Sequence, residues 1–387
     1  MEGNRTVGVL IPMIVILVAI GAVAMLAVIS ARNSSERQTA GRPGSGLRVL
    51  PPGTASVASG GTSGTARVRR RWRKASGNRL PAEAMISFDE ERQELEIDSV
   101  LAGLDRDLVG LVPVKRKVEQ IASLLLVDRA RGKFGLTAPR PNLHMCFTGP
   151  PGTGKTTMAL RMADLLHRLG YLETGQLVHA MRDDLVGEFV GHTAPKTKRV
   201  LERAMGGVLF IDEAYYLYRA ADSKDYGQEV IDILLQVMEN QRENLVVILA
   251  GYKDRMEEFF AVNPGMRSRI AHHLDFAPYD LDELVSIGQL MLDEANYHLS
   301  PAAETAFRAD VAWQMSRPGF ANARSVRNSL DRARLQHAHR LAGNPGLRWS
   351  RDDLMRLDAE DIAGDDLELA RETASMRDGG WRAKHER

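Results

Sequence analysis

The sequence contains a single cysteine, Cys146, among its 387 residues. One thiol excludes any internal disulfide bond, and the position of Cys146 in an apolar run predicts a buried, inert side chain. A strong net charge is also missing, because 51 basic and 50 acidic side chains leave only +1. Apolar residues make up 44% of the chain. This length and composition allow two or three domains with a sizeable core.

Charge is distributed unevenly along the chain, although the totals balance. Residues 1–84 carry 12 basic and three acidic side chains, a net charge of +9, and the remainder carries a net charge of −8. Residues 7–29 contain no charged side chain. A helix of that length crosses a hydrocarbon layer about 30 Å thick, so we predict a transmembrane segment within residues 1–30. More arginines follow the run than precede it, which predicts a cytoplasmic C-terminal bulk tethered to the inner face of the membrane.

Residues 31–84 are rich in Gly, Ser, Thr, Pro and Arg, which predicts a disordered basic linker. Its basic cluster at residues 67–74 suits anionic lipid headgroups or nucleic acid, and equally suits a solubilising stretch. The first stretch with a globular pattern begins at Met85. A translation start at Met85 is therefore an alternative, in which the span and linker are not part of the protein.

A phosphate-binding loop is the most informative motif of the sequence. Residues 149–156 fit the pattern G-x-x-x-x-G-K-[ST], after an apolar run at 143–147 and before a helical pattern that ends at Gly170. Glycines let N–H groups turn inward around a polyphosphate, and the helix N-terminus adds its positive dipole end. Lys155 is expected to reach the β- and γ-phosphates, and Thr156 to hold Mg²⁺. The loop residues predicted to bind ATP are Pro151, Gly152, Thr153, Gly154, Lys155, Thr156 and Thr157.

A second motif is an apolar strand that ends in two carboxylates, at residues 208–213. In phosphoryl-transfer enzymes an Asp at this place holds the metal ion, directly or through water, which assigns Asp212 to Mg²⁺. A following Glu can orient and deprotonate the attacking water, which assigns Glu213 as the general base. The two motifs together predict an ATPase with ATP and Mg²⁺ as its ligands.

Strand and helix patterns alternate across the middle of the chain. This alternation predicts an α/β fold with a parallel sheet covered by helices on both faces, over residues 85–278. The ligand is expected at the carboxyl ends of the strands. Beyond residue 278 the strand pattern stops, and helical stripes predict an all-helical lid domain over residues 279–345. Residues 346–387 are expected to form a C-terminal extension and a polar tail.

This two-part layout with its nucleotide motifs resembles the AAA+ P-loop ATPases over residues 105–345. More specific runs resemble the CbbX family, the activases of red-type rubisco. These runs are residues 182–187, 191–198, 205–218, 236–242 and 263–276.

The resemblance implies roles for further residues. Arg269 matches the arginine finger, which reaches the γ-phosphate of a neighbouring subunit, and Arg324 matches sensor 2 on the lid. Val109 and Gly110 match the adenine contact, and Phe189 matches the pore-loop aromatic that grips a substrate peptide. The residues predicted to act in catalysis are Glu213, Arg269 and Lys155.

Two features depart from the family pattern. Family pore loops usually carry Tyr where this chain has Phe189, so the apolar grip remains without the hydroxyl group. The strand at residues 245–250 leads into Gly251, with no Asn, Ser or Thr where sensor 1 commonly lies. Tyr252 or Lys253 can substitute, and the sequence leaves sensor 1 unassigned.

The resemblance implies a homohexameric ring that uses ATP hydrolysis to release inhibitory sugar phosphates from rubisco. The ring would pull on the C-terminus of the red-type rubisco large subunit, with ribulose 1,5-bisphosphate as an allosteric ligand and no nucleic acid partner. An alternative is a membrane-associated ATPase of a protein secretion system, similar to the EccA group, which the N-terminal span favours. A third possibility is a nucleotide switch without turnover, against which the intact Glu213 and Arg269 argue.

Overall fold

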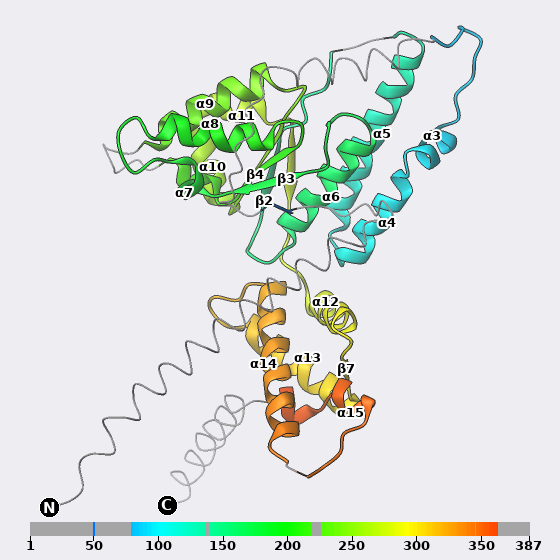
Figure 1. The fold of residues 1–387 in the computed structure, drawn as a ribbon, viewed down its shortest axis with the longest axis vertical. Coiled ribbons are helices and arrows are strands. Elements are labelled where there is room, and N and C mark those ends of the chain that lie inside the picture. The colour runs from blue at the N-terminus through cyan, green and yellow to red at the C-terminus, as the bar shows by residue number, and fades with distance from the viewer. Residues whose placement is uncertain (1–48, 51–78, 137–138, 219–225, 345, 363–387) are drawn as a thin grey trace, which may run out of the picture. The chain divides into compact units, whose positions relative to one another are not determined.

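The computed structural model describes residues 49–50, 79–136, 139–218, 226–344 and 346–362 (Figure 1). The predicted transmembrane segment at residues 7–29 lies outside these ranges, as do most of the predicted linker and the tail after residue 362. Across the ranges that the structure describes, none of the helices combines the length and the apolar character needed to cross a bilayer.

Six parallel strands form one sheet, in the order β1-β3-β4-β5-β2-β6. The prediction of an α/β core with a parallel sheet is thereby confirmed. The phosphate-loop strand β2 lies between two other strands, so the loop leaves from the interior of the sheet. The bounds are β1 (Val49–Leu50), β2 (Met145–Thr148), β3 (Leu177–Ala180), β4 (Val208–Ile211), β5 (Val246–Gly251) and β6 (His272–Asp275).

Helices cover both faces of the sheet (Figure 1). One face packs against α4 (Ile97–Asp107), α5 (Val112–Lys133) and α6 (Lys155–Arg168). The other packs against α8 (Thr193–Ala204), α9 (Gly227–Asn240) and α10 (Lys253–Val262). The shorter helices are α3 (Phe88–Glu94), α7 (Arg182–Leu185), the 3₁₀ helix η1 (Ala214–Leu217) and α11 (Pro264–Arg269).

The strand β2 illustrates how one short segment supports two cores. Successive side chains of a strand point to opposite faces. Met145 and Phe147 therefore pack in the core that includes α5 and α6, and Cys146 packs in the core that includes α8 and α9. Burial, with a smaller contribution from Asp275, raises the pKa of the Cys146 thiol to about 12. Cys146 is the buried, inert thiol that its sequence position predicted.

The helical lid consists of α12 (Leu281–Glu294), α13 (Pro301–Met315), α14 (Ala323–Ala342) and α15 (Arg351–Met355). The first two helices begin at side-chain caps, because Asp280 accepts a hydrogen bond from Glu283 N and Ser300 accepts one from Ala303 N. The prediction of a helical lid after the α/β core is confirmed.

The lid is not all-helical, which corrects one detail of the prediction. The strand β7 (His298–Leu299) pairs in parallel with β8 (Arg356–Leu357). Strands of two residues are too short to give an alternating pattern, so the sequence carries no signal for them. Leu357 is fully buried in the core that also holds lid residue Phe307. The packed part of the lid therefore runs past the expected end at residue 345.

Candidate functional site: a nucleotide cavity

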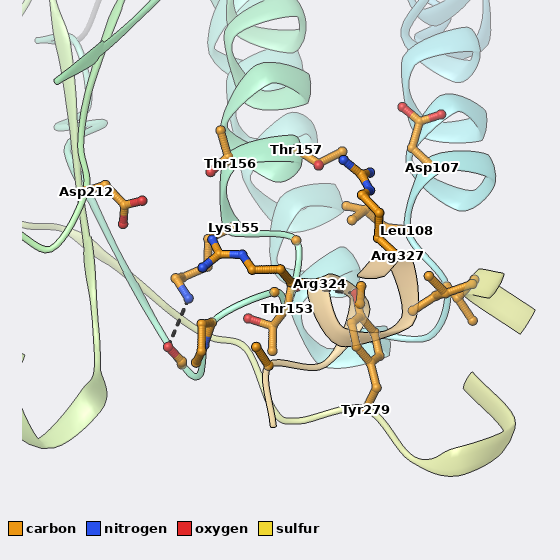
Figure 2. Close-up of a pocket in the computed structure, with 18 of the residues that line it drawn as sticks. Asp107, Leu108, Thr153, Lys155, Thr156, Thr157, Asp212, Tyr279, Arg324 and Arg327 are labelled. Atoms are coloured by element: carbon orange, nitrogen blue, oxygen red, sulfur yellow. Dashed lines mark hydrogen bonds between the residues drawn. The ribbon is translucent and has the colours of Figure 1, made fainter. Parts of the chain in front are cut away.

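A cavity of about 620 Å³ opens where the carboxyl ends of the central strands meet the lid (Figure 2). Its walls come from the phosphate loop and the start of α6, from the segments after β4 and β5, and from the lid. The lining residues are Asp107, Leu108, Val109, Gly149, Pro151, Gly152, Thr153, Gly154, Lys155, Thr156, Thr157, Asp212, Glu213, Gly251, Tyr252, Tyr279, Ile287, Met291, Gly319, Ala321, Ala323, Arg324 and Arg327.

The phosphate loop depends on glycine at two tight places. The backbone φ is +147° at Gly149 and +73° at Gly152. A Cβ atom would lie 2.2 Å from Phe276 O at the first position and 2.0 Å from Ala321 O at the second. Any side chain there would push the loop away from its neighbours. Because α6 begins at Lys155, its unpaired first-turn N–H groups and its positive dipole end lie at the cavity.

Lys155 lies folded against its own loop. Its Nζ donates hydrogen bonds to Gly149 O at 2.9 Å and to Pro150 O at 2.7 Å. A dashed line in Figure 2 marks a hydrogen bond from Lys155 to the loop. Burial lowers the pKa of Lys155, Asp212 opposes that effect, and the nearby Arg324 acts in the same direction as burial. A partly buried cation whose hydrogen bonds go to neutral carbonyls gains from an incoming polyanion, so this geometry fits a phosphate ligand.

The two carboxylates after β4 differ in their surroundings. Burial disfavours the charged form of Asp212, but His179, whose Nε2 lies 3.8 Å from Asp212 Oδ2, and the hydrogen bond from Glu213 N more than offset it, so the pKa of Asp212 lies below its usual value. The Glu213 N–H donates to Asp212 Oδ1 at 3.0 Å. Glu213 itself adopts a left-handed backbone with φ of +50°, an uncommon conformation for a residue other than glycine. Asp212 is therefore ionised, and Glu213 sits on a sharp turn beside it.

The lid supplies two cations to the cavity. Arg324 and Arg327 project from the first turns of α14, and Figure 2 shows the Arg324 side chain extending toward Lys155. Arg324 was predicted from the resemblance, and Arg327 was not. The spacing of three residues on one helix face was the available signal for the second arginine.

Apolar residues line another part of the cavity and form an apolar wall. Val109, a predicted adenine contact, lines it, and Gly110 does not belong to the lining. A Cβ at Gly110 would lie 1.8 Å from Glu283 Oε1, so this glycine permits close approach of the lid. Leu108, Ile287 and Met291 add apolar surface that the sequence reasoning missed, because two of these residues belong to the lid.

Two predicted residues lie away from the cavity of their own chain. Arg269 ends α11, where its Nη1 donates to Gly265 O at 3.0 Å and its Nε lies 3.5 Å from Glu239 Oε2. Phe189 lies in the loop between α7 and α8, and 64% of its surface is exposed. Its only described aromatic neighbour is His192, whose ring centroid is 5.5 Å away in an edge contact.

The structure distinguishes the two residues considered for sensor 1. Tyr252 lines the cavity immediately after β5. Lys253 points elsewhere, since its Nζ lies 2.7 Å from Asp275 Oδ2 in an exposed ion pair. The guanidinium of Arg255 packs over the Tyr252 ring at 5.9 Å and over the buried Tyr215 ring at 5.1 Å. Tyr252 is thus the candidate in contact with the cavity, and neighbouring rings hold it.

The fold and the cavity define an ATPase class. Residues 145–278 match the "ATPase family associated with various cellular activities (AAA)", and residues 280–372 match the "AAA lid domain". A nucleotide loop, an acidic strand end and a helical lid in this order are the parts of an AAA+ enzyme. The chain is an ATPase of that class.

Individual relatives define the family more narrowly. The chloroplastic ribulose bisphosphate carboxylase/oxygenase activase of Cyanidioschyzon merolae is 56% identical over 277 residues, which cover 72% of this chain and 94% of that protein. Protein CbbX of Cereibacter sphaeroides is 65% identical over 242 residues, covering 62% and 78%. The chromosomal protein CbxX of Cupriavidus necator is 59% identical over 266 residues, covering 69% and 84%. The chain belongs to the CbbX family of AAA+ ATPases.

These relatives decide between the functions left open by the sequence. Their names are those of rubisco activase and of the CbbX and CbxX proteins, so the secretion-system alternative is not favoured. The switch without turnover is not favoured either, because the family is one of ATPases.

Replacing Lys155 with Ala should weaken ATP binding by about 100-fold, because a partly buried cation that can bind the β- and γ-phosphates is lost. The measurement is titration with a fluorescent ATP analogue. Lys198→Ala, which removes an exposed lysine from α8, is the control and should bind as the parent does. Parental affinity in the Lys155→Ala protein would remove this cavity as the nucleotide site.

Replacing Glu213 with Gln should leave ATP affinity nearly unchanged and lower kcat by about 10²- to 10⁴-fold, because an amide cannot accept the proton of the attacking water. Phosphate release at saturating ATP measures the effect. Glu257→Gln, at an exposed position of α10, should keep the parental rate. Normal turnover in the Glu213→Gln protein would exclude Glu213 as the base.

Proposed function

We propose that this protein is a ring-forming ATPase that remodels inhibited red-type rubisco. The observation that carries the proposal is the exposed aromatic Phe189, presented by a chain 56–65% identical to a rubisco activase and to CbbX. The ring would engage the C-terminus of the rubisco large subunit and pull on it. Inhibitory sugar phosphates would then leave the distorted active site of rubisco.

ATP and Mg²⁺ fit the cavity that the chain builds. The loop 151–157, with the partly buried Lys155, is suited to a triphosphate, and the apolar wall around Val109 is suited to adenine. Thr156 and the ionised Asp212 would hold Mg²⁺ together with phosphate oxygens, since Mg²⁺ usually takes few protein ligands. The bound ion would neutralise charge that develops on the transferred phosphoryl group. Within the described residues, no cluster of three or more metal-ligating side chains offers an all-protein cage.

The hydrolytic residues are divided between subunits in this proposal. Glu213 lines the cavity and would deprotonate the attacking water. Arg269 lies on α11, outside the cavity of its own chain, which suits a finger offered to the neighbouring subunit. Its planar, permanently charged guanidinium is matched to phosphate oxygens. Tyr252, at the end of β5, is the proposed sensor 1, and Arg324 the proposed sensor 2.

The assembly and its regulation are inferred from the family. A homohexamer brings Arg269 of one subunit to the cavity of the next and gathers the Phe189 loops around one pore. Ribulose 1,5-bisphosphate is the proposed allosteric ligand. The proposed division is an α/β ATPase domain over residues 85–278 and a lid from residue 279 that continues through at least residue 362. The membrane segment at residues 7–29 stays a prediction.

Replacing Arg269 with Ala should preserve ATP binding and lower turnover by about 10³-fold or more, because the transition-state charge loses its partner. The role in trans is tested by mixing this variant with Lys155→Ala protein and measuring phosphate release. Mixed rings contain interfaces with an intact Lys155 and an intact neighbouring Arg269, so part of the activity should return. Proven mixing with no recovery would contradict the role in trans.

Replacing Phe189 with Ala should leave basal ATP hydrolysis largely intact and abolish rubisco reactivation, because the side chain supplies apolar grip rather than chemistry. Phe189→Tyr is the matched control and should retain reactivation, since the ring persists. ATP hydrolysis and reactivation are measured on the same preparation of each variant, with an inhibited red-type rubisco as the substrate for reactivation. Ring assembly of each variant is first checked by size. Full reactivation by the Ala variant would rule out pulling by this loop.

A further inference from the structure

Three successive carbonyl groups of the phosphate loop are held by donors from outside the loop. Pro151 O accepts from Asn322 Nδ2 at 3.1 Å, and Gly152 O accepts from Ala323 N at 3.2 Å. Thr153 O accepts from the hydroxyl group of Tyr279 at 3.3 Å. Asn322 and Ala323 begin the lid helix α14, and Tyr279 lies in the segment that leads from β6 to α12. The lid side therefore satisfies the outward face of the loop.

Asn322 occupies the centre of this contact. Its side chain is 2% exposed, and its Oδ1 accepts a second hydrogen bond from Tyr279 N at 3.1 Å. One amide thus connects the phosphate loop, the segment entering the lid and the start of α14. Asn is a preferred N-cap residue, yet the Asn322 side chain makes no capping bond to its own helix. Its polar atoms are used across the contact instead.

The backbone of Asn322 is itself unfavourable for this residue type. Its φ and ψ are +49° and −130°, and Arg324 N donates to Ala321 O at 3.0 Å across it. These values are close to the first central position of a type II′ turn, where glycine is preferred. Glycine would relieve the backbone but would bring no amide. The presence of Asn here is explained by its two side-chain hydrogen bonds.

We propose that Asn322 is a positioning residue that couples the lid to the conformation of the phosphate loop. A loop can turn its N–H groups toward phosphates only while its carbonyl groups point away, and buried carbonyls need donors. Asn322 supplies one donor and fixes the start of the helix that carries Arg324 and Arg327. Nucleotide binding and lid docking therefore favour each other, because each stabilises the same loop geometry. The inference rests on the proposed nucleotide cavity.

The test is Asn322→Gly, which removes the amide and keeps the backbone conformation. We expect the Kd for a fluorescent ATP analogue to rise about tenfold, as for the loss of two buried hydrogen bonds. Glycine adopts the positive φ at position 322 without strain, which offsets part of the stability lost with the two hydrogen bonds. The Tm of the protein without nucleotide should therefore fall by less than about 5 °C. A role in folding alone would lower this Tm and leave the Kd of the folded protein unchanged.

The matched control is Asn296→Gly. Asn296 is an exposed lid residue with φ of +57° outside the cavity lining, and the same substitution there should leave the Kd unchanged. Tyr279→Phe is the second variant, because it removes only the hydroxyl donor to Thr153 O and keeps the ring; its Kd should rise a few-fold. If Asn322→Gly lowers Tm beyond the expected range, Tyr279→Phe decides, and parental affinity in that protein overturns the proposal.

The binding measurements distinguish a failure of the lid–loop coupling from a failure of the nucleotide cavity. Parental affinity in folded Asn322→Gly protein overturns the coupling and leaves the nucleotide cavity intact. A folded parent that binds no ATP analogue, or a Lys155→Ala protein that binds normally, overturns the cavity itself. Weakened binding in both Asn322→Gly and Tyr279→Phe, with Asn296→Gly like the parent, supports the coupling.

Discussion

The phosphate loop can offer its N–H groups to a ligand only if its carbonyl groups find donors on the opposite side. For the three carbonyls at positions 151–153 those donors come from Asn322, Ala323 and Tyr279, none of which is near the loop in sequence. Gly152 permits the contact, because a Cβ there would collide with the lid backbone. The anion site is therefore a joint product of the α/β core and the lid, and the lid cannot move far without changing the site.

Local patterns predicted most of the α/β core from the sequence. The strands β2, β4 and β5 are continuous apolar runs, as expected for parallel strands buried on both faces. Helices α3 and α4 were not predicted, although Ile97, Val100 and Leu104 are buried at helical spacing in α4. The pair β7–β8 could not be predicted, because each strand is two residues long and the paired residues, such as His298 and Arg356, lie about 58 positions apart in the sequence.

In the candidate site, too, the residues in short sequence motifs could be predicted, and the residues that reach the cavity through tertiary packing could not. The loop 151–157 and Asp212 with Glu213 are short motifs, and the structure brings them to one cavity. Ile287, Met291 and Arg327 meet that cavity only because the lid folds onto the core, so their positions follow from tertiary packing. Lys253 forms an ion pair with Asp275, and no local sequence pattern encodes that pair, so the sequence could not separate Tyr252 from Lys253.

One of the residues predicted to act in catalysis, Arg269, lies outside the cavity of its own chain. Lys155, Asp212 and Glu213 face the cavity, whereas Arg269 is held at the end of α11 by Gly265 O and Glu239. The partner carboxylate Glu239 is exposed and its oxygen lies 3.5 Å from Arg269 Nε, so this pair adds little stability and Arg269 can exchange Glu239 for a stronger anion at modest cost. Phe189 is likewise 64% exposed, in the loop between α7 and α8. Because Arg269 lies outside the cavity of its own chain, the proposed function assigns it to the cavity of a neighbouring subunit. In that proposal, the hydrogen bonds from Asn322, Ala323 and Tyr279 to the phosphate loop are the route by which a bound nucleotide influences the lid.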